Sequence, residues 1–389
     1  LVYLFFGGFI IARALEETNL HYRIALWILR RTGTGSRGLL AGFMLSTAFM
    51  SMWISNTATS IMMLPIATSV LAVLPKTSAE KMERPLLLSI AWAANIGGMA
   101  TIIGTPPNMI FAGFLSEQLD RQIGFVEWLP IGLSASVTIG LSAYAILSRS
   151  LRTLALSPQE QKETERYLQQ EWDRLGSMNK AQRKVAIIFT STALLWIMRP
   201  YLGALSAHIH WSDTGISLLA AVLLFSLTGE SGKNLLDWES TSKLPWGILI
   251  LFGGGLALAG TLQQSYWFEA LEVGMKSFEN IPILFWVIIM ALLGVFATEL
   301  LSNMALVSAL MPLVLSLSLT FGWSMEILSM PLVLGASCAF MLPMATPPNA
   351  IVFSTGKLTV GYMMARGIIL NIISVAILVA LGMVLVTMG

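Results

Sequence analysis

The stretch of sequence that decides the fold is FMSMWISNTATSIMMLP at residues 49–65, an apolar run with Ser-Asn-Thr at 55–57 in its middle. Residues 296–312, FATELLSNMALVSALMP, repeat the pattern, with Ser302 and Asn303 at the matching positions. Unwound backbone cannot face lipid, because its N–H and C=O groups would find no partner there, but it is tolerated where it lines a watery cavity. Both stretches therefore predict a polar tip between two apolar helical arms.

Each pair of arms has two interpretations. The arms could form a re-entrant hairpin, at 38–75 and at 281–320, whose tip stops within a membrane, or they could be two full spans. If the first pair is a hairpin that enters from the cytoplasm and the second enters from outside, nearly all basic residues lie inside, as the positive-inside rule requires. The exceptions are Arg121, Arg199 and Lys276.

The composition places the whole chain in a membrane. Of 389 residues, 56% are hydrophobic and only 11% are charged, against about 25% in soluble domains, and the mean hydropathy is +0.75. Apolar runs of about 20 residues recur along the chain. These values exclude a disordered chain, a coiled coil and an ordinary cytosolic enzyme, and predict an all-α polytopic membrane protein. The single cysteine, Cys338, excludes an intramolecular disulfide and a cysteine-based metal cluster.

Two further stretches repeat in the same order. Residues 4–17, LFFGGFIIARALEE, resemble residues 251–264, LFGGGLALAGTLQQ, and Gly7 and Gly8 pair with Gly253 and Gly254. The motif Thr-Pro-Pro-Asn occurs at 105–108 and again at 346–349. The orientation above runs the two copies in opposite directions through the membrane. We therefore predict an inverted-repeat secondary transporter, in which the substrate site lies at the repeat interface near the midplane.

The predicted domains follow from this repeat. The first repeat is 1–148, a cytoplasmic linker helix occupies 149–183, and the second repeat is 184–389. In the linker, Ser157, Pro158 and Glu160 form a helix start signal and Gly176 can end the helix. Two spans at 184–203 and 215–229 have no counterpart before Leu1, so we expect about 60 further residues with two spans upstream in the full-length protein.

The repeated motifs suggest a chemistry. Hydroxyl, amide and freed carbonyl oxygens at the tips are neutral ligands that suit a monovalent cation such as Na⁺, and Asn and Thr can donate to a carboxylate. The N-terminus of the second hairpin arm faces the same point and favours an anion. The two prolines of each Thr-Pro-Pro-Asn motif remove donors, and Gly97 and Gly98 loosen the first copy further. We predict discontinuous helices at 85–115 and 330–355 whose broken backbone completes the cation sites.

The motifs SMWISNTAT, IGGMATIIGTPPN and MLPMATPPNAIVF resemble those of the divalent anion/sodium symporter family, which includes the sodium-coupled dicarboxylate transporters. The resemblance spans the whole chain. It implies two Na⁺ sites, one at each hairpin tip, with the substrate between them, a homodimer, and residence in the bacterial inner (cell) membrane. It implies no other cofactor and no nucleic-acid partner.

The resemblance also assigns residues to the sites. The first Na⁺ site would use Ser51, Ser55, Asn56 and the backbone of Gly104. The second would use Thr298, Asn303 and the backbones of Leu301 and Ala345. The substrate residues would be Asn56, Thr57, Thr105, Asn303, Met304, Thr346 and Pro347. Met304 departs from the family, where many dicarboxylate carriers have Thr, so a hydroxyl donor is lost and the preferred anion is left open.

These features favour sodium-coupled uptake of a small di- or tricarboxylate, such as succinate, malate or fumarate, by alternating access. The alternatives are a sodium-coupled carrier of sulfate or another inorganic divalent anion, and a dicarboxylate exchanger that does not use Na⁺. An intramembrane enzyme is not expected, because no span contains His and Cys338 has no basic partner in its segment. The anion site itself is expected to contain no cationic side chain.

Three other features carry less weight. Glu299, beside Thr298, could modulate the second cation site or carry a proton, or could form a structural pair at the hairpin base. His208 and His210 are interpreted as residues of a solvated loop rather than metal ligands. The glycines at 253–255 lie inside a span and indicate close helix packing rather than nucleotide binding.

Overall fold

The computed structural model describes residues 2–205, 211–229, 232–263, 278 and 280–388. Within these residues every regular element is a helix, and the β-structure is limited to one isolated bridge between Thr228 and Asn234. The all-α prediction is therefore confirmed. His208, His210 and Lys276 lie outside the described residues.

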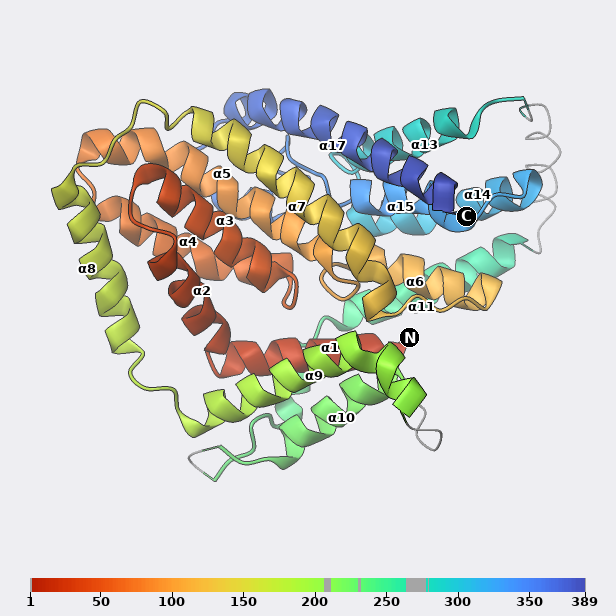
Figure 1. Ribbon diagram of the computed structural model, residues 1–389, viewed down its shortest axis with the longest axis horizontal. Helices are drawn as coiled ribbons and strands as arrows, with labels where there is room; N and C mark the ends of the chain where they lie inside the picture. The colour runs from red at the N-terminus through yellow and green to blue at the C-terminus, as the bar shows by residue number, and fades with distance from the viewer. Residues whose placement is uncertain (1, 206–210, 230–231, 264–277, 279, 389) are drawn as a thin grey trace.

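One group of helices lies along a single side of the molecule (Figure 1). Helix α1 (Val2–Glu17) packs against α9 (Lys180–Leu205) and α10 (Asp213–Ser226), and the 3₁₀ turn η1 (Trp238–Lys243) leads into α11 (Trp246–Gln263). Gly7 allows the close approach of α1 to α10, because a Cβ at this position would lie 2.6 Å from the Ser217 Cβ. We call α1, α9 and α10 the scaffold layer.

The first predicted hairpin consists of α3 (Ser36–Ser51) and α4 (Asn56–Ala72), joined by a short non-helical tip. Both arms pack against the long helix α5 (Lys76–Ala100). The contact between α3 and α5 is close because Gly97 has no side chain: a Cβ there would lie 2.2 Å from the Ala48 carbonyl oxygen.

The first Thr-Pro-Pro-Asn motif lies at a gap between two helices. Helix α5 ends at Ala100, and α6 (Pro106–Leu119) begins at the first proline. The prediction that Gly97 and Gly98 loosen this helix is wrong, because α5 continues through both glycines. Their role is close packing, and the break falls later, at residues 101–105. After α6, helix α7 (Phe125–Arg149) runs back along α5.

The second half has the same order of elements, with a shorter helix before its break than α5. Helix α13 (Ile283–Leu292) continues as a π-helical turn, η2 (Leu293–Ala297), and α14 (Asn303–Phe321) follows the tip. Helix α15 (Met325–Gly335) then stops, an irregular segment covers 336–346, and α16 (Pro347–Phe353) begins at the second motif. The long helix α17 (Val360–Met388) closes the chain against α7, α13 and α15.

Two further helices, α2 (Leu20–Arg31) and α8 (Pro158–Arg174), connect the scaffold layer to the rest of the molecule at one end (Figure 1). Helix α2 connects α1 to the first hairpin, and α8 is the predicted linker helix. The expected start signal of α8 is present, because the Ser157 hydroxyl accepts from the Glu160 N–H and the Glu160 carboxylate accepts from the Ser157 N–H. The buried Arg23 of α2 donates to the Leu175 and Gly176 carbonyl oxygens at 2.9 and 3.0 Å, which caps the other end of α8.

Among the described residues, four helices are long and apolar enough to cross a membrane. They are α7, α14, α17 and the residues Lys180–Leu202 of α9. The shorter apolar helices among these residues are α4, α10, α13 with η2, and α15.

Candidate functional site

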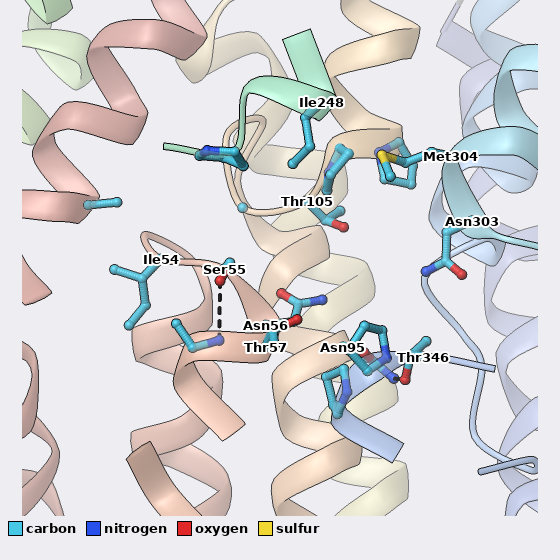
Figure 2. Close-up of a pocket in the computed structure, with 18 of the residues that line it drawn as sticks. Ile54, Ser55, Asn56, Thr57, Asn95, Thr105, Ile248, Asn303, Met304 and Thr346 are labelled. Carbon is cyan, nitrogen blue, oxygen red and sulfur yellow. Dashed lines mark hydrogen bonds between the residues drawn. The ribbon is translucent and has the colours of Figure 1, made fainter. Parts of the chain in front are cut away.

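The two hairpin tips and the two helix breaks converge on one pocket of about 740 Å³ (Figure 2). All of the residues predicted to bind substrate line it: Asn56, Thr57, Thr105, Asn303, Met304, Thr346 and Pro347. Residues predicted for the cation sites also reach it: Ser55, Gly104, Leu301 and Ala345. Segments about 250 residues apart in sequence therefore form a single cavity, whose inner wall carries amide and hydroxyl groups.

Behind the first tip, three oxygen atoms lie close together. Ser51 Oγ lies 2.7 Å from Asn56 Oδ1 and 2.7 Å from the Ala94 carbonyl oxygen, and Ser51 is fully buried. The hydroxyl has one proton and can donate to only one of these oxygens at a time. The cluster is therefore richer in acceptors than in donors. The Ser55 hydroxyl caps α4 by accepting from the Ala58 N–H at 3.2 Å.

The second tip repeats this cluster with different side chains. Thr298 Oγ1 lies 2.7 Å from Asn303 Oδ1 and 2.8 Å from the Ala336 carbonyl oxygen, and Thr298 is fully buried. The roles of Ser51, Asn56 and Ala94 are thus taken by Thr298, Asn303 and Ala336. The internal repeat seen in the sequence is matched here by an equal set of contacts.

The asparagines of the two Thr-Pro-Pro-Asn motifs hold the broken backbone in place. Asn108 Nδ2 donates to the carbonyl oxygens of Gly98 and Thr101, at 3.3 and 2.8 Å. Asn349 Nδ2 donates to those of Ala339 and Leu342, at 3.1 and 2.9 Å. Each side chain supplies donors that the prolines removed from the helix.

Gly98 explains how the first tip reaches α5. A Cβ at this position would lie 2.6 Å from Asn56 Oδ1, so any larger residue would push the Asn56 amide away from Ser51. Sequence reasoning identified this glycine but gave it the wrong role.

Sequence reasoning also missed charged residues at the rim. Arg13 and Glu16 of α1 and Lys243 at the end of η1 line the side of the pocket that the scaffold layer forms. Arg13 pairs with Glu16 at 2.9 Å and also with Glu17, and Lys243 lies 3.8 Å from Glu17. The expectation of a lining without cationic side chains is therefore wrong for the rim. The Gly-Gly repeat placed Arg13 in a span but gave no sign that its end faces the tips.

Glu299 has the structural role that was one of its interpretations. The carboxylate is 4% exposed and accepts from the N–H groups of Phe340 and Met341, both at 2.8 Å, and of Leu342 at 2.9 Å. Asn371 Nδ2 adds a fourth donor at 2.8 Å. The side chain thus ties the tip of the second hairpin to the irregular segment 336–346 and to α17.

Comparison with known proteins identifies the group to which the chain belongs. The family model described as the sodium:sulfate symporter transmembrane region matches residues 1–388. The chain belongs to the sodium:sulfate symporter family, and the resemblance to divalent anion/sodium symporters is confirmed. Curated members include the sodium-dependent dicarboxylate transporters SdcS of Staphylococcus saprophyticus and of Staphylococcus aureus. Each relative is 35% identical to this chain, and the matched region covers 97% of this chain and 75% of the relative.

Solved structures share the fold at low sequence identity. The YdaH transporter of Alcanivorax borkumensis aligns with a TM-score of 0.62 over 100% of this symporter-family chain and 85% of its own, at 13% identity. MtrF of Neisseria gonorrhoeae aligns with a TM-score of 0.61 over 98% and 79%, also at 13% identity. Family and relatives establish an integral membrane transporter rather than an enzyme.

Proposed function

We propose that this symporter-family chain couples the uptake of a small dicarboxylate to Na⁺. The observation that carries the proposal is the pair of matching oxygen clusters behind the two tips, around Ser51 and Thr298. Buried neutral oxygens with too few protons between them suit a monovalent cation, and one such cluster lies behind each of the two tips that line the pocket. The 35% identical relatives named as sodium-dependent dicarboxylate transporters support the same assignment.

The first Na⁺ site would consist of Ser51, Ser55, Asn56 and the Gly104 backbone. The second would consist of Thr298, Asn303 and the backbones of Leu301 and Ala345. The substrate carboxylates would bind to Asn56, Thr57 and Asn303, assisted by Thr105, Thr346 and Pro347, with Met304 covering the apolar middle. The nearby cations Arg13 and Lys243 are paired with Glu16 and Glu17, so the anion would be held by amides, hydroxyls and bound Na⁺.

We further propose alternating access between two inverted repeats. In support, the α3–α4 hairpin enters from the end of the molecule where α8 lies, and α13–α14 enters from the opposite end (Figure 1). In this mechanism Na⁺ orders the two tips, the anion completes the site, and the hairpin block moves against the scaffold layer. The repeats would divide at the 149–183 linker.

We also propose that the protein forms a homodimer. We place it in the bacterial inner membrane, because the curated relatives are staphylococcal proteins. Exposed apolar side chains on α9 and α10, such as Ile187, Leu194 and Val222, are available for contact within the bilayer. Native mass spectrometry from lipid nanodiscs measures this assembly, and a monomer at all protein concentrations would contradict it.

The transport experiment is uptake of radiolabelled succinate and sulfate into proteoliposomes, with and without an inward Na⁺ gradient. We expect succinate uptake that requires Na⁺, and we expect Asn56→Ala and Asn303→Ala each to abolish most of it. Succinate uptake without Na⁺ would exclude symport, and sulfate uptake alone would change the substrate class. Unchanged transport in both variants would refute the proposed pocket.

A further inference from the structure

Asn95 connects the two halves of the chain at the pocket wall, and sequence reasoning gave it no role. It lies on α5, is 1% exposed and lines the pocket. Its Nδ2 donates to the Ala339 carbonyl oxygen at 3.3 Å and to Thr346 Oγ1 at 3.1 Å. Figure 2 shows Asn95 and Thr346 side by side. A carbonyl can only accept, so the nitrogen of this amide, and not its oxygen, faces Ala339 and Thr346.

This contact leaves the Thr346 hydroxyl with a single function. A hydroxyl has two acceptor lone pairs and one proton. Thr346 Oγ1 accepts from Asn95 Nδ2 at 3.1 Å and from the Asn349 N–H at 3.4 Å, so both lone pairs are engaged. Only the proton remains, and Thr346 lines the pocket at the N-terminus of α16.

We propose that Asn95 is a positioning residue that fixes Thr346 as a hydrogen-bond donor to one carboxylate of the transported anion. This inference rests on the proposed function and adds a specificity element to it. A hydroxyl that can only donate stabilises an ionised carboxylate, which accepts only. It does not favour a group that must itself donate, such as an amide nitrogen or a protonated acid.

The first half of the chain lacks this device. Ala94 and Ala336 hold equivalent positions, because their carbonyl oxygens contact Ser51 and Thr298 in the same way. The residue after Ala336 is Ser337, which therefore corresponds to Asn95. Its buried hydroxyl has no hydrogen-bond partner in the described part of the chain, and Thr105 makes no side-chain cap at the start of α6. The pocket thus offers one carboxylate a fixed donor, the Thr346 hydroxyl, while the equivalent hydroxyl of the first half, on Thr105, is free to rotate.

The test is a double-mutant cycle on the purified full chain. Asn95→Leu has a similar shape but no donor, and Thr346→Val has a similar shape but no hydroxyl. The readouts are the Kd for succinate at saturating Na⁺, by calorimetry, and the KM and Vmax of uptake in proteoliposomes. We expect each single variant to raise Kd and KM about 10-fold, equivalent to about 1.4 kcal/mol, with Vmax within about two-fold.

The cycle separates positioning from simple packing. The double variant should bind succinate no more weakly than Thr346→Val alone, because Asn95 acts through Thr346. In contrast, the fold-changes in Kd caused by Asn95→Leu and by Thr105→Val should multiply when the two are combined. Ser337→Ala is the matched control and should leave Kd unchanged, and Thr346→Ser should retain affinity because it keeps the hydroxyl. Asn95→Ala is measured in parallel, in case the leucine prevents folding.

Multiplicative effects of Asn95→Leu and Thr346→Val, or loss of Vmax without loss of affinity, would overturn this inference alone. A wild-type chain that binds no dicarboxylate would instead overturn the proposed function and the inference with it.

Discussion

Replacing Glu299 by Gln should destabilise the second half of the protein far more than a neutral substitution at the surface. The carboxylate is buried and receives four N–H donors, from Phe340, Met341, Leu342 and Asn371. Gln has nearly the same shape but carries an NH₂ in place of one oxygen. In its better orientation the NH₂ replaces Oε2 and faces the Leu342 N–H, so two donors meet and that backbone group loses its partner.

The expected magnitude follows from these contacts. An unpaired buried N–H costs about 1–3 kcal/mol, and three bonds that change from charged to neutral acceptors lose roughly 1 kcal/mol each. Removal of a buried charge returns part of this sum, because its desolvation penalty also disappears. We therefore expect a net loss of about 3 kcal/mol in the free energy of unfolding.

The assay is equilibrium unfolding in mixed detergent and SDS micelles, followed by tryptophan fluorescence. Glu165→Gln is the matched control, because Glu165 is exposed on α8, and it should change stability by less than about 0.5 kcal/mol. Glu299→Asp, which keeps the charge on a shorter side chain, should lose less than Glu299→Gln. Equal stability of Glu299→Gln and wild type would refute the view that this carboxylate holds the irregular segment together.

The other predictions test packing, capping and titration. Gly97→Ala should lower expression and stability, because its Cβ would lie 2.2 Å from the Ala48 carbonyl oxygen, whereas Gly247→Ala meets no atom within 4 Å and should be neutral; size-exclusion profiles compare the two. Arg23→Gln should expose α8 to limited proteolysis by uncapping its C-terminal end, and unchanged cleavage rates would contradict this. Burial lowers the pKa of His21 below its ordinary value of 6.5, although its contact with a backbone carbonyl acts the other way. The unfolded chain therefore binds more protons than the folded one, so stability is lost as pH falls through about 6.5 and below; the melting temperature should drop less between pH 7.5 and 5.5 in His21→Gln, and an equal drop would exclude this contribution.

The polar tips, the two breaks and the linker helix were predictable because each has a local signal. Ser-Asn within an apolar run and paired prolines within a span are violations of helix chemistry that can be seen in one dimension. The capping box at Ser157 is equally local. The residues predicted to bind substrate line one pocket, which the repeat made predictable, while Ser51 and Thr298 lie behind the tips.

What could not be predicted depends on contacts between distant segments. Asn95 appears in the sequence as one polar residue in a helix, and only the fold shows that it meets Thr346. Arg13 is likewise an ordinary charge near the end of a span until the scaffold layer brings it to the pocket rim. Gly98 was misread because glycine both weakens helices and permits close approach, and only the position of Asn56 decides between the two.

The attachment of α8 has a mechanical consequence. One end of α8 is joined to the first turn of α5 by the Ser78–Glu160 hydrogen bond, and the other end is held by Arg23 of α2. Helices α2 to α5 and α8 are therefore linked to one another by packing and hydrogen bonds, and we call this group the frame. The chain enters this frame through Asn19, whose φ of +54° makes a sharp corner between α1 and α2. The chain leaves the frame for the scaffold layer between α8 and α9, where Gly176 has a φ of +61°. A movement of the frame against the scaffold layer would therefore require backbone rotation at these two places, Asn19 and Gly176.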